Sequence, residues 1–345
     1  MNQSAYPILN FLKLIGSPYD NHSPENLDFD SSSFLDFAVK NRIRLLYLNS
    51  LDRHRRLGTF QEKRNELLRK YQEIQRAFFK ISNHLNNSQV KYALFKSIRP
   101  YQEVTVDIDI LIFGNQYQKV LDSLYAAGYL YLGEGPLSTT FRDREVGIGL
   151  DIYDEVGVSH IIYMDKNQLE EFVTPISLSV DCTAKSLNPA ADLLAVIAHS
   201  VIKEHMYVLS EYYTTLHYLR LFSEKDLSSF VSLAKECKLS STAKTHLTIT
   251  AFLHGSAHGF VPKGLANLLG MLEAEEDFEI AGLVKNRFFV PHKYHPKTVL
   301  NAFLEKSSEL KARQSFAAQI YHLLNPRFAS SFVKLGLDHV LRSTY

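Results

Sequence analysis

Cysteine is scarce in this sequence. Only Cys182 and Cys237 occur among 345 residues, which is too few for a disulfide framework or a cysteine-ligated zinc site and fits the reducing cytosol. Net charge is also small, at +1, so no overall electrostatic field favours a nucleic-acid partner, although local basic patches remain open. With 46% hydrophobic and 22% charged residues, the composition is that of a globular protein and excludes extensive disorder.

Long apolar runs are missing as well. The longest, around Leu193 to Val201, is interrupted by His199 and is too short to span a bilayer. Residues Met1 to Tyr6 lack the basic region and the apolar stretch of a signal peptide. We therefore expect a cytoplasmic protein with no membrane partner.

The hydrophobic pattern divides the chain into three blocks, predicted as a helical N-terminal region (1–88), an α/β core (89–186) and a helical C-terminal domain (187–345). Short strands are predicted at Tyr92–Phe95, Val106–Phe113 and Gly149–Tyr153, and a helix at Tyr117–Ala127 that ends before a glycine. A long amphipathic helix before this core is predicted from apolar residues at every third or fourth position: Leu67, Leu68, Tyr71, Ile74, Phe78, Ile81 and Leu85.

Two carboxylates begin the apolar strand Val106-Asp107-Ile108-Asp109-Ile110-Leu111-Ile112. Because successive side chains of a strand point to opposite faces, Asp107 and Asp109 share one face. Two acids on one face can hold a divalent metal ion. Asp151, on a later strand of the same block, can join them if the two strands are neighbours; the alternative is that it only ends its strand.

A turn precedes this strand. Tyr92-Ala93-Leu94-Phe95 is followed by Lys96-Ser97-Ile98-Arg99-Pro100, which predicts a strand, a turn and the start of a helix. Such a turn presents backbone N–H groups and the positive end of a helix dipole to a phosphate. We therefore place Lys96, Ser97 and Arg99 at a nucleotide site, and a metal with a phosphate suggests nucleotide chemistry.

The order of these features resembles the DNA polymerase beta nucleotidyltransferase superfamily. The resemblance is closest to a branch with a helical N-terminal region, a Leu-Lys-Gly turn, an Asp-Ile-Asp strand, a helix ending in Gly-Tyr, and a later helix with His and Lys. The corresponding segments, which lie between about Ser31 and Leu221, are Leu94-Phe95-Lys96-Ser97, Asp107-Ile108-Asp109, Leu124-Tyr125-Ala126-Ala127-Gly128-Tyr129, and the helix from His199 to Tyr213.

The resemblance implies an α+β fold with a mixed sheet and a transfer of a nucleoside monophosphate from a nucleoside triphosphate to an acceptor hydroxyl. It implies Mg²⁺ (or Mn²⁺) held by Asp107 and Asp109, with Asp151 completing the metal site and helping to deprotonate the acceptor. Ser97 and nearby amides would bind the β- and γ-phosphates. The acceptor is a small molecule, a protein or a tRNA end.

The phosphate turn departs from the superfamily because it has no glycine, the residue that lets the backbone approach a phosphate and adopt positive φ. Two alignments are open. Either Ser97 has the hydroxyl role and Lys96 stands where glycine is expected, or Lys96 keeps its place and Ser97 replaces the glycine.

The segment from Asp192 through Lys203 to Tyr213 is expected to be one helix bordering the nucleotide cleft. Helical spacing places His199 and Lys203 on one face. In one interpretation Lys203 contacts the triphosphate and His199 orients an aspartate or a sugar hydroxyl; in the other His199 is a buried core residue and Lys203 is on the surface.

Two basic segments have two interpretations each. The first, Arg142-Asp143-Arg144, is a phosphate clamp or a solvated loop. The second is the C-terminal region from Lys285 onward, a track for tRNA or another polyanion or the outside of a helical bundle. Its basic residues include Lys293, Lys297, Lys311, Arg313, Arg327 and Arg342.

The sequence thus predicts a Mg²⁺-dependent nucleotidyltransferase. The alternative is a catalytically inactive binding or regulatory protein that keeps the fold, such as a toxin–antitoxin or defence partner. In that case the altered phosphate turn is the cause of the inactivity.

Overall fold

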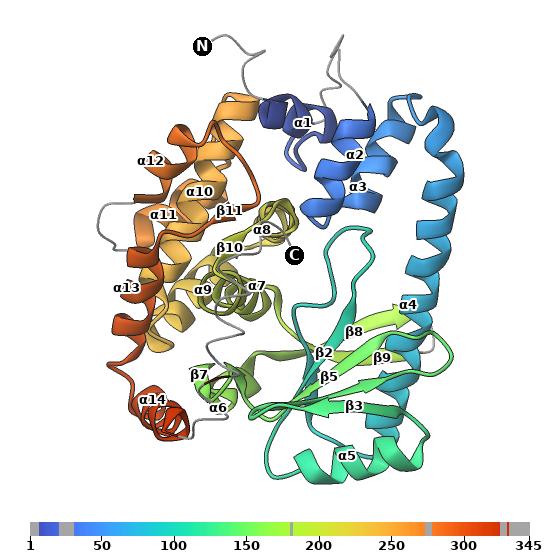
Figure 1. Ribbon diagram of the computed structural model, residues 1–345, viewed down its shortest axis with the longest axis vertical. Coiled ribbons are helices and arrows are strands. Elements are labelled where there is room, and N and C mark those ends of the chain that lie inside the picture. Colours follow the sequence, from blue (N-terminus) through green and yellow to red (C-terminus); the bar gives the residue numbers. More distant parts are fainter. Residues whose placement is uncertain (1–6, 21–30, 180–181, 273–277, 325–329, 331–345) are drawn as a thin grey trace.

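A mixed β-sheet flanked by helices organises the chain, as the computed structural model in Figure 1 shows. The structure describes residues 7–20, 31–179, 182–272, 278–324 and 330. Helices precede the sheet and follow it in sequence, so the expected α+β class is confirmed. No helix in these ranges is long and apolar enough to cross a membrane.

Helices make up most of the two terminal regions. The N-terminal helices are α1 (Pro7–Ile15), α2 (Ser31–Lys40), α3 (Arg44–Arg53) and α4 (Gln61–Asn87). The sheet region contains α5 (Tyr117–Ala126) and α6 (Lys166–Leu169). The C-terminal helices are α7 (Pro189–Ala198), α8 (Leu209–Leu221), α9 (Glu224–Glu236), α10 (Ser240–His258), α11 (Lys263–Met271), α12 (Phe278–Lys285), α13 (Pro296–Lys306) and α14 (Leu310–Leu323).

The main sheet has seven strands in the order β3-β4-β5-β2-β1-β9-β8. They are β1 (Tyr92–Leu94), β2 (Asp107–Ile112), β3 (Leu130–Glu134), β4 (Ser138–Arg142), β5 (Gly149–Tyr153), β8 (Val173–Ser179) and β9 (Cys182–Leu187). β2 pairs in parallel with β5 and antiparallel with β1. Two small ribbons pair β6 (Val156–Val158) with β7 (Ile161–Met164), and β10 (Met206–Tyr207) with β11 (His292–Lys293).

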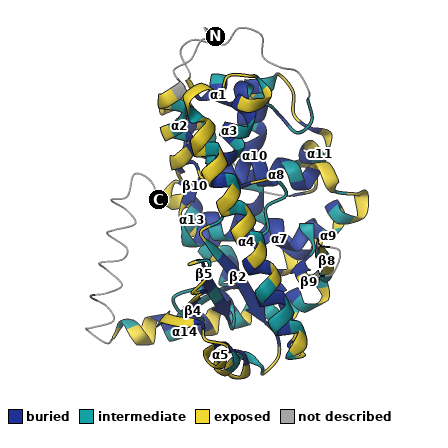
Figure 2. Ribbon diagram, turned by 90° about the vertical axis from the view of Figure 1, so that its right-hand side faces the viewer, coloured by how far each residue is buried: buried dark blue, intermediate teal, exposed yellow. Residues whose placement is uncertain are grey.

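The alternation along β2 gives the sheet two different faces. Ile108, Ile110 and Ile112 pack in one apolar cluster with α4 and α5, whereas Leu111 belongs to a second cluster with α7. Asp107 and Asp109 therefore lie on the face turned towards α7. Figure 2 shows β2 and α7 as buried and the outward side of α4 as exposed, as expected for an amphipathic helix.

Several predicted elements are confirmed. The strands at 92, 107 and 149 and the amphipathic helix α4 are present. Helix α5 ends as expected at Gly128, which has φ +83°; the Tyr129 N–H donates to the Leu124 carbonyl, which closes the helix end.

The expected single helix from Asp192 to Tyr213 is wrong. Asn188 caps α7 by accepting from the Ala191 N–H, but α-helical geometry ends at Ala198 and one π-helical turn, His199–Lys203, follows. His205 then adopts φ +53° and the chain enters β10 before α8 begins. The C-terminal region is thus mostly helical, as predicted, but contains a two-stranded ribbon that the sequence pattern did not indicate.

The two terminal helical regions share one apolar core. Phe11 of α1, Leu111 of β2 and Leu253 of α10 belong to the same buried cluster. The predicted break at Asn325-Pro326 lies outside the described residues.

Candidate functional site

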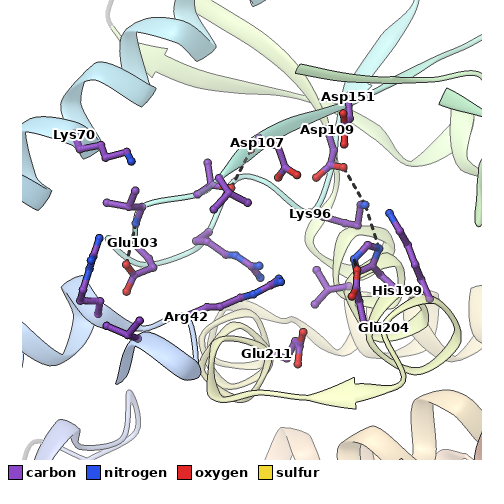
Figure 3. A pocket seen from close by; sticks show the side chains of 18 of the residues that line it. Arg42, Lys70, Lys96, Glu103, Asp107, Asp109, Asp151, His199, Glu204 and Glu211 are labelled. Carbon is purple, nitrogen blue, oxygen red and sulfur yellow. Dashed lines mark hydrogen bonds and ion pairs between the residues drawn. The ribbon is translucent and has the colours of Figure 1, made fainter. Parts of the chain in front are cut away.

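A cavity of about 340 Å³ lies between the sheet, α7, α8 and the N-terminal helices (Figure 3). The predicted site residues that line it are Lys96, Arg99, Asp107, Asp109, Asp151, His199 and Lys203. Among the residues assigned to the site from sequence, only Ser97 is missing from this lining. Arg142 and Arg144 do not line the cavity either.

The three carboxylates share one face of two neighbouring strands. Asp109 and Asp151 are directly opposite each other in the parallel pairing of β2 with β5, and Asp107 lies two residues earlier on β2, opposite Gly149. The condition set for Asp151, that its strand is a neighbour of β2, is therefore met. Thr140 of β4 fixes Asp151 by donating to its Oδ1 at 2.6 Å.

Lys96 occupies the strained position of the turn. Its φ is +59°, the left-handed region in which the superfamily pattern expects glycine, and its N–H donates to Asp192 Oδ1 at 2.6 Å. Asp192 is buried in the first turn of α7 and also accepts from the Tyr218 hydroxyl at 2.6 Å. The backbone of Lys96 therefore has the conformation expected of the glycine in the first alignment, but Ser97 does not line the cavity, as the hydroxyl role in that alignment would require.

Ser97 binds the aspartate strand instead of facing the cavity. Its hydroxyl donates to Asp109 Oδ2 at 2.9 Å and accepts from the Asp109 N–H at 2.7 Å. The side chain is buried, so Ser97 positions Asp109.

Asp109 and Asp107 differ in their charge environment. The Lys96 ammonium lies 3.0 Å from Asp109 Oδ1. Burial acts to raise the pKa of Asp109, but Lys96 and other nearby cations outweigh it and lower that pKa. Burial and then the charge of Asp109 raise the pKa of Asp107 to about 7. One carboxylate is therefore neutralised by the protein and the other is not.

His199 is held neutral. Burial and then the charge of Lys96 lower its pKa to about 3. Its Nδ1 accepts from the Lys96 ammonium at 3.4 Å, and its Nε2 lies 3.1 Å from Glu204 Oε1. A neutral imidazole satisfies both contacts with the proton on Nε2. His199 thus orients Lys96, and through Lys96 an aspartate, which agrees with one of the roles considered for it.

Lys203 and Arg99 supply further positive charge to the cavity. Lys203 is on the π-helical turn, a feature that often occurs at functional sites; burial and the nearby Lys96 lower its pKa. Arg99 donates to the Thr214 hydroxyl of α8 at 3.0 Å. The interpretation of Lys203 as a plain surface residue is excluded by its place in the cavity lining.

The N-terminal helices contribute site residues that sequence reasoning missed. Arg42, Arg44 and Lys70 line the cavity, and Figure 3 shows Lys70 on the side away from His199. Glu103, in the same region, is buried and accepts from the Leu45 and Leu46 N–H groups at the start of α3; burial raises its pKa to about 7. The sequence shows Glu103 in the loop before the Asp-x-Asp strand, but it does not show that Glu103 contacts α3.

In each of the two basic segments, one residue forms ion pairs away from the cavity. Asp143 is buried and binds Lys80 at 3.0 Å, so its loop is a structural turn. Lys311 pairs with Glu155 and Asp165 at 2.7 and 2.6 Å, which fixes α14 beside β7. Arg327 and Arg342 lie outside the described residues. Cys237 is buried and free.

The donor set fits a divalent metal ion in its chemistry, because carboxylate oxygens are the ligands that Mg²⁺ prefers. However, Ser97 and Lys96 occupy both oxygens of Asp109, and in the described part of the chain no three His, Cys, Asp or Glu side chains are arranged to hold a metal. Thr140 binds one oxygen of Asp151, so Asp107 and the second oxygen of Asp151 are the groups of this cluster that would hold an ion.

Comparison of the chain with protein-family models finds no match, and comparison with curated proteins finds none either.

Proposed function

We propose that the protein is a metal-dependent nucleotidyltransferase with a polymerase beta-like core. The observation that carries this proposal is the register of β2 and β5, which places Asp109 opposite Asp151 on the face that carries Asp107. These acids line a cavity that also contains Lys96, Arg99 and Lys203. Acids beside clustered cations suit a phosphate chain bound with a divalent metal.

In the proposed reaction the acceptor oxygen forms a bond to the α-phosphorus of a nucleoside triphosphate. The bond from that phosphorus to the bridging oxygen of the β-phosphate breaks, and pyrophosphate leaves. Asp151 accepts the proton of the acceptor hydroxyl; burial raises its pKa above the ordinary carboxyl value, which favours this role.

Mg²⁺ or Mn²⁺, when bound, neutralises charge on the phosphates and lowers the pKa of the attacking hydroxyl. Asp107 and Asp151 would hold it. Lys203 and Arg99 bind phosphate oxygens, since both line the same cavity. Lys203 lies on the π-helical turn, whereas Arg99 lies in the loop after Lys96, where the expected helix does not begin. Ser97 keeps Asp109 in place.

The acceptor class stays open among small molecules, protein hydroxyls and a tRNA end. Lys311 forms ion pairs with Glu155 and Asp165. Its charge is therefore already used within the protein, which argues against a role for this residue in binding tRNA. Arg42, Arg44 and Lys70 also line the cavity and favour an acceptor with an anionic group.

The direct test measures pyrophosphate release from each of the four nucleoside triphosphates with Mg²⁺ or Mn²⁺, together with transfer of an α-labelled phosphate to the protein itself or to bulk tRNA. We expect release with at least one triphosphate and its loss in Asp107→Asn. Release that persists in this variant would contradict the proposal.

One observation favours the inactive alternative, a binding or regulatory protein. Lys96 already neutralises Asp109. A chain that no longer binds a metal requires such a cation beside its buried carboxylate. This alternative predicts triphosphate binding that does not depend on a divalent ion.

A further inference from the structure

A lysine ammonium lies inside the carboxylate cluster. Lys96 Nζ is 3.0 Å from Asp109 Oδ1, and both side chains are less than 10% exposed. Figure 3 shows Lys96 between Asp109 and His199.

The surrounding residues hold the ammonium at this point. Its charge lies 4.7 Å and 5.0 Å from the ring centres of Phe95 and Tyr153, and a cation is attracted to an aromatic face at such distances. His199, itself bound to Glu204, accepts a hydrogen bond from it.

The backbone of Lys96 also holds its side chain at this place. Lys96 has a left-handed conformation, which is unfavourable for a lysine, and Asp192 fixes it from the first turn of α7. A residue without a side chain would satisfy this backbone at less cost. The lysine is therefore explained by what its side chain does.

Sites that transfer phosphoryl groups commonly hold two divalent ions about 4 Å apart. We propose that the Lys96 ammonium is a built-in cation that takes the place of a second divalent ion, so that the site accepts a single exchangeable metal at Asp107 and Asp151. This inference rests on the proposed function. All three aspartates line the cavity, but Lys96 and Ser97 contact both oxygens of Asp109, whereas Thr140 contacts only one oxygen of Asp151. Two positive charges, one fixed and one exchangeable, would then face the triphosphate.

The test counts metal ions directly. The full chain is titrated with Mn²⁺ alone, and free Mn²⁺ is followed by electron paramagnetic resonance. Wild type is expected to bind one ion per chain. Lys96→Gly and Lys96→Asn, which both tolerate positive φ and remove the charge, are expected to bind a second ion and to hold the first about tenfold more tightly, since a cation close to the ligands is gone. Circular dichroism confirms that each variant is folded.

Lys96→Arg keeps the charge and serves as the matched control, with one ion expected. Two ions in wild type, or the same number in wild type and both neutral variants, would overturn the inference. If wild type binds two ions and loses both in the double variant Asp107→Asn, Asp151→Asn, the inference fails while the metal-dependent function stands. If no variant binds Mn²⁺, both fail.

Discussion

At the scale of single residues, the site is a pair of unequal aspartates. Lys96 and Ser97 stabilise the charge of Asp109. Asp107, two residues away, lies beside two other acids and lacks a comparable cation. An ionised Asp107 therefore destabilises the folded chain until a positive ion arrives.

Asp107→Asn is expected to stabilise the metal-free protein at high pH. The folded pKa of Asp107 is raised to about 7 while its unfolded value stays near that of a free carboxyl. Its contribution to stability is thus intact below the unfolded pKa and is lost as pH rises to about 7. Urea unfolding in EDTA should show the variant more stable than wild type by about 2 kcal/mol at pH 8, with the gap closing as pH falls to 4.

Asp109→Asn provides the comparison for this experiment. It leaves the buried Lys96 ammonium without its carboxylate, so it should destabilise the protein at pH 8. If the two variants shift stability in the same direction, the unequal charge environment described for them is incorrect.

Ser97→Ala is expected to lower the free energy of unfolding by about 1–3 kcal/mol, because the buried Asp109 N–H loses its acceptor and Oδ2 loses a donor. Chemical denaturation measures this. Ser97→Thr keeps the hydroxyl and is the control. A Ser97→Ala protein as stable as wild type would show that Ser97 does not hold Asp109.

The residue types in the sequence predicted which side chains lie close together, but not which contacts each side chain makes. Alternation along residues 107–112 was enough to place Asp107 and Asp109 on one face. The sequence left the turn ambiguous because either Lys96 or Ser97 can stand in for glycine, and residue types alone do not show the left-handed backbone of Lys96. Ser97 was assigned to phosphate from its place in the turn, because its contact with Asp109, twelve residues later, is not visible in the sequence.

At the scale of elements, strands with strong alternation and the amphipathic helix α4 were predictable. Helix α7 was predicted to run too far, since residues 199–213 are apolar enough for a helix. The break arises from tertiary structure: β10 pairs with β11, about 85 residues later in the chain. Strand β3 was not predicted for another reason: it lies at the sheet edge, and its Leu130 and Tyr131 are exposed, so it lacks an alternation of buried and exposed side chains.

Helix α14 should depend on Lys311 for its docking. Lys311→Glu replaces two ion pairs with repulsion from Glu155 and Asp165, which should cost about 1 kcal/mol or more and speed proteolysis within α14. Arg313→Glu, at an exposed position of the same helix, is the matched control and should change neither. Equal proteolysis of both variants would indicate that the ion pairs do not anchor the helix.

At the scale of the whole molecule, the cavity joins three regions of the chain. The sheet supplies the acids, the region after Pro189 supplies His199 and Lys203, and the N-terminal helices supply Arg42, Arg44 and Lys70. Sequence reasoning placed the first two together through the resemblance. It could not place the third, since surface arginines and lysines on amphipathic helices carry no signal of what they face.

The most direct test of the central claim, a metal-dependent nucleotide site at the aspartates, is isothermal titration with each nucleoside triphosphate in Mg²⁺ and in EDTA. The account predicts Mg²⁺-dependent binding of at least one triphosphate, weakened more than about tenfold in the double variant Asp107→Asn, Asp151→Asn, which leaves the Asp109–Lys96 pair intact. Asp122→Asn, on the exposed side of α5, should bind as wild type does. Triphosphate binding that is equal in EDTA, or unchanged in the double variant, would contradict the account.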